Sequence, residues 1–169
     1  MIIRTIRPSD TEQFLHLRMQ LDEETQFMLL EPGERNISLE EQLYQIEQVL
    51  SKENQVIFVV EQDGQLIGYL GAIGGDFNRN KHSAEIVIGI LQAFTGQGVG
   101  SQLFIAMEAW ARQKQLHRLE LTVMTHNRAG VALYRKRGFE IEGTKRHALV
   151  VNGKYVDEFY MAKLLDWGL

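Results

Sequence analysis

The spacing of the apolar residues changes near residue 55, and this change limits the folds open to the chain. Before it, apolar residues in 14–21 and 43–50 recur every three or four positions, as in amphipathic helices. After it, the β-rich runs 56–60 and 66–72 are joined by Asp63-Gly64, a strong signal for a two-residue hairpin turn. The chain therefore combines helices with an antiparallel hairpin.

Cap and turn signals delimit the remaining elements. Ser9 or Asp10 can cap the first helix, and Ser38 with Glu41 predicts a capping box for the second. The apolar residues expected on the buried side of the first helix are Phe14, Leu15, Leu17, Met19 and Leu21. Asn152-Gly153 predicts the turn of a final hairpin. The predicted order is strand, two helices, three strands, helix, strand, helix and two strands, which indicates an α/β (α+β) fold.

Length and composition exclude several classes of protein. At 169 residues without a linker or repeat, the chain predicts a single domain, 1–169, large enough to bury its own core. The absence of cysteine excludes thiolate metal sites, disulfides and a cysteine nucleophile. No apolar run reaches 18 residues and the N-terminus carries charges. We therefore expect a cytoplasmic protein with no membrane partner.

Charge is distributed unevenly along the chain. Residues 1–64 contain five basic and thirteen acidic side chains, whereas residues 112–154 contain ten basic and three acidic ones. An acidic half can attract an amine and a basic half a polyanion such as a nucleotide phosphate, although solvated helix faces produce the same pattern. The chain lacks a DNA- or RNA-binding motif and its pI is about 5.7, so we expect no nucleic-acid partner.

A glycine-rich segment follows the predicted strand 84–91. Gly96, Gly98 and Gly100 allow the backbone to approach a ligand closely and leave the N–H groups of the next helix free, which suits an anion. The segment is neither a Walker loop, since no Lys-Ser/Thr follows, nor a GxGxxG dinucleotide fingerprint. Taken alone, it is equally compatible with a flexible connection before a helix.

Two segments resemble motifs of the GNAT superfamily of N-acetyltransferases. Residues 88–101 (IGILQAFTGQGVGS) are similar to its acyl-CoA pyrophosphate loop, Arg/Gln-x-x-Gly-x-Gly/Ala, with Thr95 at the Arg/Gln position. Residues 127–139 (NRAGVALYRKRGF) resemble its Asn-x-x-Ala-x-x-Leu-Tyr-x-x-x-Gly-Phe helix, with Gly130 at the Ala position. The resemblance implies a GNAT-type fold: a mixed, mostly antiparallel central sheet of about seven strands flanked by helices.

The resemblance also implies how acetyl-CoA, the expected co-substrate, would bind. A strand that splays from its neighbour would bind pantetheine through its exposed backbone, and the glycine loop with the following helix N-terminus would bind pyrophosphate, with no metal. The implied cofactor-binding residues are Ile88, Gly89, Ile90, Thr95, Gly96, Gln97, Gly98, Val99, Gly100, Ser101, Asn127 and Tyr134.

Two proton transfers define the implied catalytic residues. Tyr134 is the expected acid that protonates the leaving thiolate, and Glu85 is the expected base, acting directly or through water. Each residue also has a simpler interpretation: Tyr134 as an aromatic packed on the sheet, Glu85 as a solvated strand residue and Asn127 as a helix cap. His126 is a second candidate base.

The acceptor is expected to bind between the first helices and the last hairpin. Glu24, Phe27, Met28 and Glu31 are the predicted substrate-binding residues, with Asp22 and Glu23 in the same acidic segment. We expect acetyl transfer to a primary amine of a small molecule, such as an amino acid or polyamine, by direct attack in a ternary complex. The alternatives are a protein N-terminal or lysine acetyltransferase and a non-catalytic acyl-CoA sensor, and a homodimer is a candidate assembly.

Overall fold

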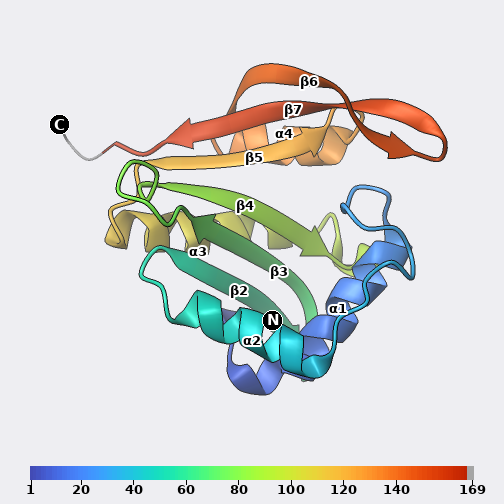
Figure 1. Cartoon of the computed structure of the whole chain (residues 1–169), viewed down its shortest axis with the longest axis vertical. Coiled ribbons are helices and arrows are strands. Elements are labelled where there is room, and N and C mark those ends of the chain that lie inside the picture. The colour runs from blue at the N-terminus through green and yellow to red at the C-terminus, as the bar shows by residue number, and fades with distance from the viewer. Residues whose placement is uncertain (167–169) are drawn as a thin grey trace.

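The protein folds around one seven-stranded sheet that contains the first strand, β1, and the last, β7, and that is covered by helices (Figure 1). The structure is a computed structural model that describes residues 1–166. Its strands and α-helices in chain order are β1 (Ile2–Thr5), α1 (Thr11–Glu24), α2 (Leu39–Leu50), β2 (Gln55–Gln62), β3 (Gln65–Gly74), β4 (Ser83–Ile90), α3 (Val99–Gln113), β5 (Arg118–Met124), α4 (Arg128–Lys136), β6 (Glu140–Val151) and β7 (Lys154–Leu164). This order confirms the predicted succession of elements and the mixed α/β class.

The sheet has the order β1-β2-β3-β4-β5-β7-β6 and is antiparallel except between β4 and β5. Both predicted hairpins are present. Asp63 and Gly64 have φ values of 50° and 79°, and Asn152 and Gly153 have 51° and 76°. Positive φ at both central positions is what a two-residue hairpin turn requires, so local sequence determines both strand pairings.

β4 and β5 pair over only a short stretch before they separate. The parallel register joins Ser83–Glu85 to Arg118–Glu120 and ends there, although both strands continue. Figure 1 shows the two strands diverging toward their C-terminal ends, with the loop between α1 and α2 beside the opening. The sheet is therefore split at its centre, as the resemblance implied.

Helices cover both faces of the sheet, with α1 and α2 on one and α3 and α4 on the other (Figure 1). Two adjacent residues of β4 face these two helix layers. A Cβ built at Gly89 would lie 2.7 Å from Leu21 of α1, whereas Ile90, whose side chain points to the opposite face, approaches Gly100 at the start of α3. Gly89 thus gives α1 room to pack directly on β4.

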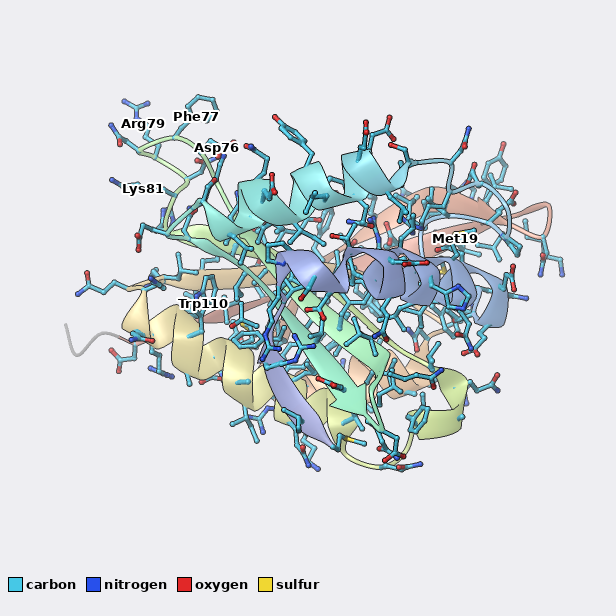
Figure 2. The ribbon with its side chains drawn as sticks, turned by 90° about the horizontal axis from the view of Figure 1, so that it is seen from below. Met19, Asp76, Phe77, Arg79, Lys81 and Trp110 are labelled. Carbon is cyan, nitrogen blue, oxygen red and sulfur yellow. The ribbon has the colours of Figure 1, made fainter. Side chains whose placement is uncertain are left out.

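Two predictions for the first helix were wrong in detail. Asp10 does not cap α1, because its carboxylate accepts hydrogen bonds from the Arg7 N–H and from Arg4, and the bonded Arg4 guanidinium lowers the pKa of Asp10. Met19 is 44% exposed and lies on the outer side of α1 (Figure 2). At 100° per residue it lies on the opposite side of the helix from Leu17 and Leu21, which are buried.

The segment between β3 and β4 is shorter than expected. The sequence predicted a β-rich run from 66 to 72, but β3 continues to Gly74, which pairs with Ala84 of β4. Phe77 and Arg79 project from the remaining loop into solvent (Figure 2). Within residues 1–166, none of the helices is long and apolar enough to cross a membrane.

Candidate active site

A cavity of about 1100 Å³ occupies the opening between β4 and β5. It is lined by the end of α1 and the following loop, the separated parts of β4 and β5, the glycine loop, the start of α3, α4 and three positions of the last hairpin. The predicted residues that line it are Glu24, Phe27, Met28, Glu85, Ile88, Gly89, Ile90, Thr95, Gly96, Gly98, Val99, Gly100, Ser101, Asn127 and Tyr134. Residues from both predicted motifs and from the acidic segment thus meet in one space.

One edge of β4 offers unpaired backbone groups to this cavity. Just after β4, the Leu91 N–H donates to the carbonyl of Ile67 in β3. Just before β4, the carbonyl of His82, an odd number of residues away from Leu91, accepts from the Arg118 N–H of β5. Because backbone groups alternate in direction along a strand, the N–H and C=O groups of Ile88 and Ile90 face the β5 side. Beyond Glu85 no strand within residues 1–166 pairs with that edge. An extended amide chain can bind there as an added strand.

Gly89, also predicted as a cofactor-binding residue, lines the cavity in a different way. It pairs with Tyr69 of β3, so its backbone groups point away from the opening. Glycine at this position leaves space for the Leu21 side chain, because a Cβ there would lie 2.7 Å from the Leu21 Cδ1. Gly89 therefore shapes the cavity through packing.

The glycine loop places free N–H groups at the start of α3. Gly96 and Gly98 have φ values of 72° and 81°, which favour glycine, and a Cβ at either would meet no protein atom within 4 Å. Gly98 is the N-cap and gives the helix no side-chain cap, so the amides of the first turn point into the cavity mouth without a protein partner among residues 1–166. This end of α3 is suited to an anionic group.

Thr95 and Gln97 contribute less than the sequence motif suggests. The Thr95 hydroxyl donates to the Gln92 carbonyl at 2.8 Å, and the Gln97 amide donates to the Ala93 carbonyl at 3.3 Å. Gln97 lies outside the cavity lining. Both side chains fold the loop back on itself, which leaves the anion contacts to the backbone.

Tyr134 is buried, and its hydroxyl has no hydrogen-bond partner within residues 1–166. Its ring packs against Phe104 and Phe139, with centroids 5.6 and 6.4 Å away. Burial raises the pKa of Tyr134 to about 12, so its hydroxyl keeps its proton at neutral pH. The side chain thus packs on its neighbours and also lines the cavity.

Asn127 caps α4 and also lines the cavity. Its Oδ1 accepts from the Gly130 N–H at 3.0 Å, which confirms the predicted cap. A Cβ at Gly130 would lie 2.7 Å from the Asn127 Nδ2, so glycine at this position allows the amide to pack tightly against the helix. The orientation of the Asn127 side chain therefore depends on Gly130.

Glu85 lies at the point where β4 and β5 begin to separate. It pairs with Ile73 of β3 and with Glu120 of β5, and its exposed side chain points to the face that carries α1. It also lines a second cavity of about 540 Å³, which shares Lys145 and Glu158 with the first. A carboxylate at this junction can accept a proton from a molecule entering between the two cavities.

The acidic residues at the end of α1 and in the following loop have different environments. Glu24 lines the cavity and accepts the Gln92 N–H at 2.8 Å. Glu31 lies outside the lining, and its N–H donates to Glu34. Asp22, expected to attract an amine, is only 2% exposed and forms a two-bond ion pair with Arg35. Its charge is neutralised within the protein, so Asp22 does not face the acceptor.

Several lining residues have no motif of their own. The sequence did not single out Leu121–Met124, Lys136, Lys145, Leu149 or Glu158, which enter the lining through β5, α4 and the last hairpin. Their position depends on the splay of β4 from β5, so only a topological argument could have found them.

The described part of the chain contains no group of three His, Asp or Glu residues arranged to hold a metal ion. His126, the second candidate base, is not among the lining residues, but its ring lies 5.3 Å from that of Phe27, which is.

Comparisons with known proteins agree with this architecture. An L-amino acid N-acetyltransferase (AaaT) of Escherichia coli (strain K12) is 36% identical over 106 residues, 60% of this chain and 64% of that relative, so the match spans less than two thirds of its length. A spermidine N(1)-acetyltransferase of the same strain is 29% identical over 154 residues, 89% of this chain and 80% of that protein.

A solved structure extends the likeness to nearly the whole fold. The crystal structure of an acetyltransferase of the GNAT family from Streptococcus pneumoniae is 29% identical, with a TM-score of 0.94 over 97% of this chain and 99% of that one. Residues 17–139 match the family model described as the acetyltransferase (GNAT) family, and they contain most of the cavity lining. The chain therefore belongs to the GNAT acetyltransferase family.

Proposed function

We propose that this protein is an N-acetyltransferase that moves an acetyl group from acetyl-CoA to a primary amine of a small molecule. The observation that carries the proposal is the continuity of unpaired backbone groups, from the open edge of β4 at Ile88 and Ile90 to the free amides at the start of α3. Pantetheine amides fit the first and a pyrophosphate fits the second. We further propose that the whole chain acts as one domain, since a single sheet joins β1 to β7.

Direct attack in a ternary complex requires few groups from the protein. The amine nitrogen attacks the thioester carbonyl, its proton passes to Glu85 or to water held by Glu85, and an unpaired N–H of β4 stabilises the oxyanion. The C–S bond then breaks, and Tyr134 donates its proton to the thiolate. The raised pKa of Tyr134 keeps its hydroxyl protonated until the thiolate forms, so the proton is present when the C–S bond breaks.

The acceptor side supports an amine of modest size. Glu24, Glu85 and Glu158 bring negative charge to the cavity, and Lys145 provides one cation that can meet an acceptor carboxylate. The names of the two relatives mention an L-amino acid and spermidine, which share a primary amine. Both acceptor types therefore belong in the first test.

A panel of amines assayed for CoA release tests the proposal directly. We expect release with free amino acids or short polyamines, and acetyl-CoA binding in calorimetry that is unchanged by EDTA. Release only with peptides would indicate a protein acetyltransferase, and binding without release for any amine would indicate an acyl-CoA sensor. No binding of acetyl-CoA would contradict the assignment of the cavity.

A further inference from the structure

The loop between α1 and α2, residues 25–38, forms one wall of the cavity, and a buried ion pair fastens it to α1. We propose that Asp22 and Arg35 are positioning residues that hold this loop as the wall of the acceptor pocket. The proposal rests on the proposed function, because it names which side of the cavity the acceptor uses.

The geometry of the pair is that of a rigid tie. The Arg35 Nε donates to the Asp22 Oδ2 at 2.8 Å, and its Nη2 donates to the Oδ1 at 3.0 Å. The two side chains are 9% and 2% exposed. Two parallel bonds fix the orientation as well as the distance of a guanidinium, so the end of the loop is held in one arrangement on α1.

A second arginine joins this tie to α2. Arg18 of α1 donates to the Gln42 Oε1 at 2.8 Å and to the Gln45 Oε1 at 3.2 Å, both on α2. Burial and the neighbouring Arg35 lower the pKa of Arg18. The two helices that bracket the loop are therefore fixed to each other at the point where Arg35 binds Asp22.

The last turn of α1 connects this network to the site. Leu21 packs on Gly89 of β4, and the Glu24 carboxylate accepts the Gln92 N–H that follows β4. Farther along the loop, the Phe27 ring lies 5.3 Å from the ring of His126, which follows β5. The loop thus reaches from the β4 side of the opening to the β5 side, while its far end is anchored by Arg35.

A second buried ion pair, away from the cavity, serves as a control that distinguishes loss of loop positioning from loss of stability. Arg4 binds Asp10 through two bonds of 2.8 and 2.9 Å, with side chains 16% and 8% exposed. This pair ties β1 to the turn before α1, and neither residue lines the cavity. Removing its charge changes a similar buried pair without releasing the loop.

The experiment compares Asp22→Asn and Arg35→Gln with Asp10→Asn. We expect the first two variants to raise the amine KM by about tenfold while the acetyl-CoA KM stays within about twofold, because the cofactor strand is held by β3. Hydrogen exchange of peptides from residues 25–37 should become faster in the same two variants. Asp10→Asn should lower the melting temperature and change neither measurement.

Equal changes in both KM values, or loop exchange no faster than in Asp10→Asn, would overturn the proposal. Should Arg35→Gln not fold, Arg35→Lys keeps the charge but only one bond, and an intermediate amine KM and exchange rate are expected. If the parent acetylates no amine, the proposed function fails, yet loop exchange in Asp22→Asn against Asp10→Asn still decides whether the pair holds the loop.

Discussion

The two sides of the cavity are built in different ways. On the side where we propose that acetyl-CoA binds, the cofactor side, β4, the glycine loop and α3 follow one another in the chain, and the proposed contacts are mainly with backbone N–H and C=O groups. On the acceptor side, side chains from the end of α1, β5 and β7 meet only through the tertiary fold. One side therefore depends on local conformation and the other on long-range packing.

This difference predicts how each side responds to substitution. A backbone site should tolerate changes of side-chain chemistry, such as Thr95 at the motif's Arg/Gln position, but it should be sensitive to added bulk where the chain needs glycine. A side-chain site responds to loss of a charge or a hydrogen-bonding group. Substitutions on the two sides should therefore differ in whether they change turnover or acetyl-CoA affinity.

Tyr134 should have the largest effect, since it lies where the two sides meet. Tyr134→Phe removes a proton donor and keeps the ring packed between Phe104 and Phe139, so we expect turnover to fall about 10²–10⁴-fold with nearly unchanged acetyl-CoA affinity. Steady-state kinetics and calorimetry measure the two quantities.

The pH dependence provides an independent check on Tyr134. With its pKa raised to about 12, the hydroxyl is protonated throughout the assay range, so the variant should lower the whole profile without removing a limb near neutrality. Tyr44→Phe, an exposed position on α2, is the control. Parental turnover in Tyr134→Phe would show that the residue is structural and that water protonates the thiolate.

Glu85 tests the acceptor side. Glu85→Gln keeps the shape of the side chain and removes its basicity, so we expect turnover to fall by roughly 10²-fold and the acidic limb of the pH–rate profile to move, because a base must be deprotonated to act. Glu120→Gln is the matched control, since Glu120 is the neighbouring position on β5 but is held by Arg118 at 2.7 Å. An unchanged profile would exclude Glu85 as the base.

Gly98 tests the backbone side. Gly98→Val places a β-branched residue at φ 81° in the mouth of the cavity. Acetyl-CoA affinity should therefore weaken by well over tenfold, where tenfold corresponds to about 1.4 kcal/mol of binding free energy. Gly153→Val meets the same strain at φ 76° with no atom within 4 Å, but outside the cavity. It should lower stability and leave affinity intact, and equal affinities in the two variants would refute the loop assignment.

The elements predicted from the sequence are those with local causes. The turns at Asp63-Gly64 and Asn152-Gly153, the Ser38 capping box and the Asn127 cap each depend on residues within a few positions, and all are present. The glycine loop follows the same rule. Because the cofactor side is made from such segments, its position in the chain could be predicted in advance.

The remaining features depend on side-chain partners that no local sequence pattern identifies. Nothing near Asp22 indicates that Arg35 will bury its charge, and nothing near Asp10 indicates that Arg4 will bind its carboxylate and leave α1 without that cap. Lys145 and Glu158 enter the lining only because β7 pairs with β5. The sequence therefore located the segment expected to bind the acceptor. It did not reveal the ion pairs and strand pairings that determine which charged side chains face the cavity.

The smallest expected effect concerns the one place where the cofactor side depends on a single side-chain contact. Gly130 occupies the family's alanine position, three residues after Asn127, and a Cβ there would lie 2.7 Å from the Asn127 Nδ2. Alanine gains about 1 kcal/mol of helix propensity over glycine, while displacing the cap costs about 1 kcal/mol. The two terms oppose each other, so Gly130→Ala should leave the free energy of unfolding nearly unchanged.

Acetyl-CoA affinity should nevertheless fall by a few-fold in Gly130→Ala if the Asn127 amide binds the pantetheine arm, because the displaced amide no longer lines the cavity in the same orientation. Asn127→Ser is the matched variant: serine also caps a helix well, so stability should hold, while the amide is lost. Both variants should therefore share weakened affinity at constant stability in calorimetry and denaturant unfolding. Weakened affinity in neither would assign Asn127 to capping alone, and the cofactor side would then consist of backbone groups together with Tyr134.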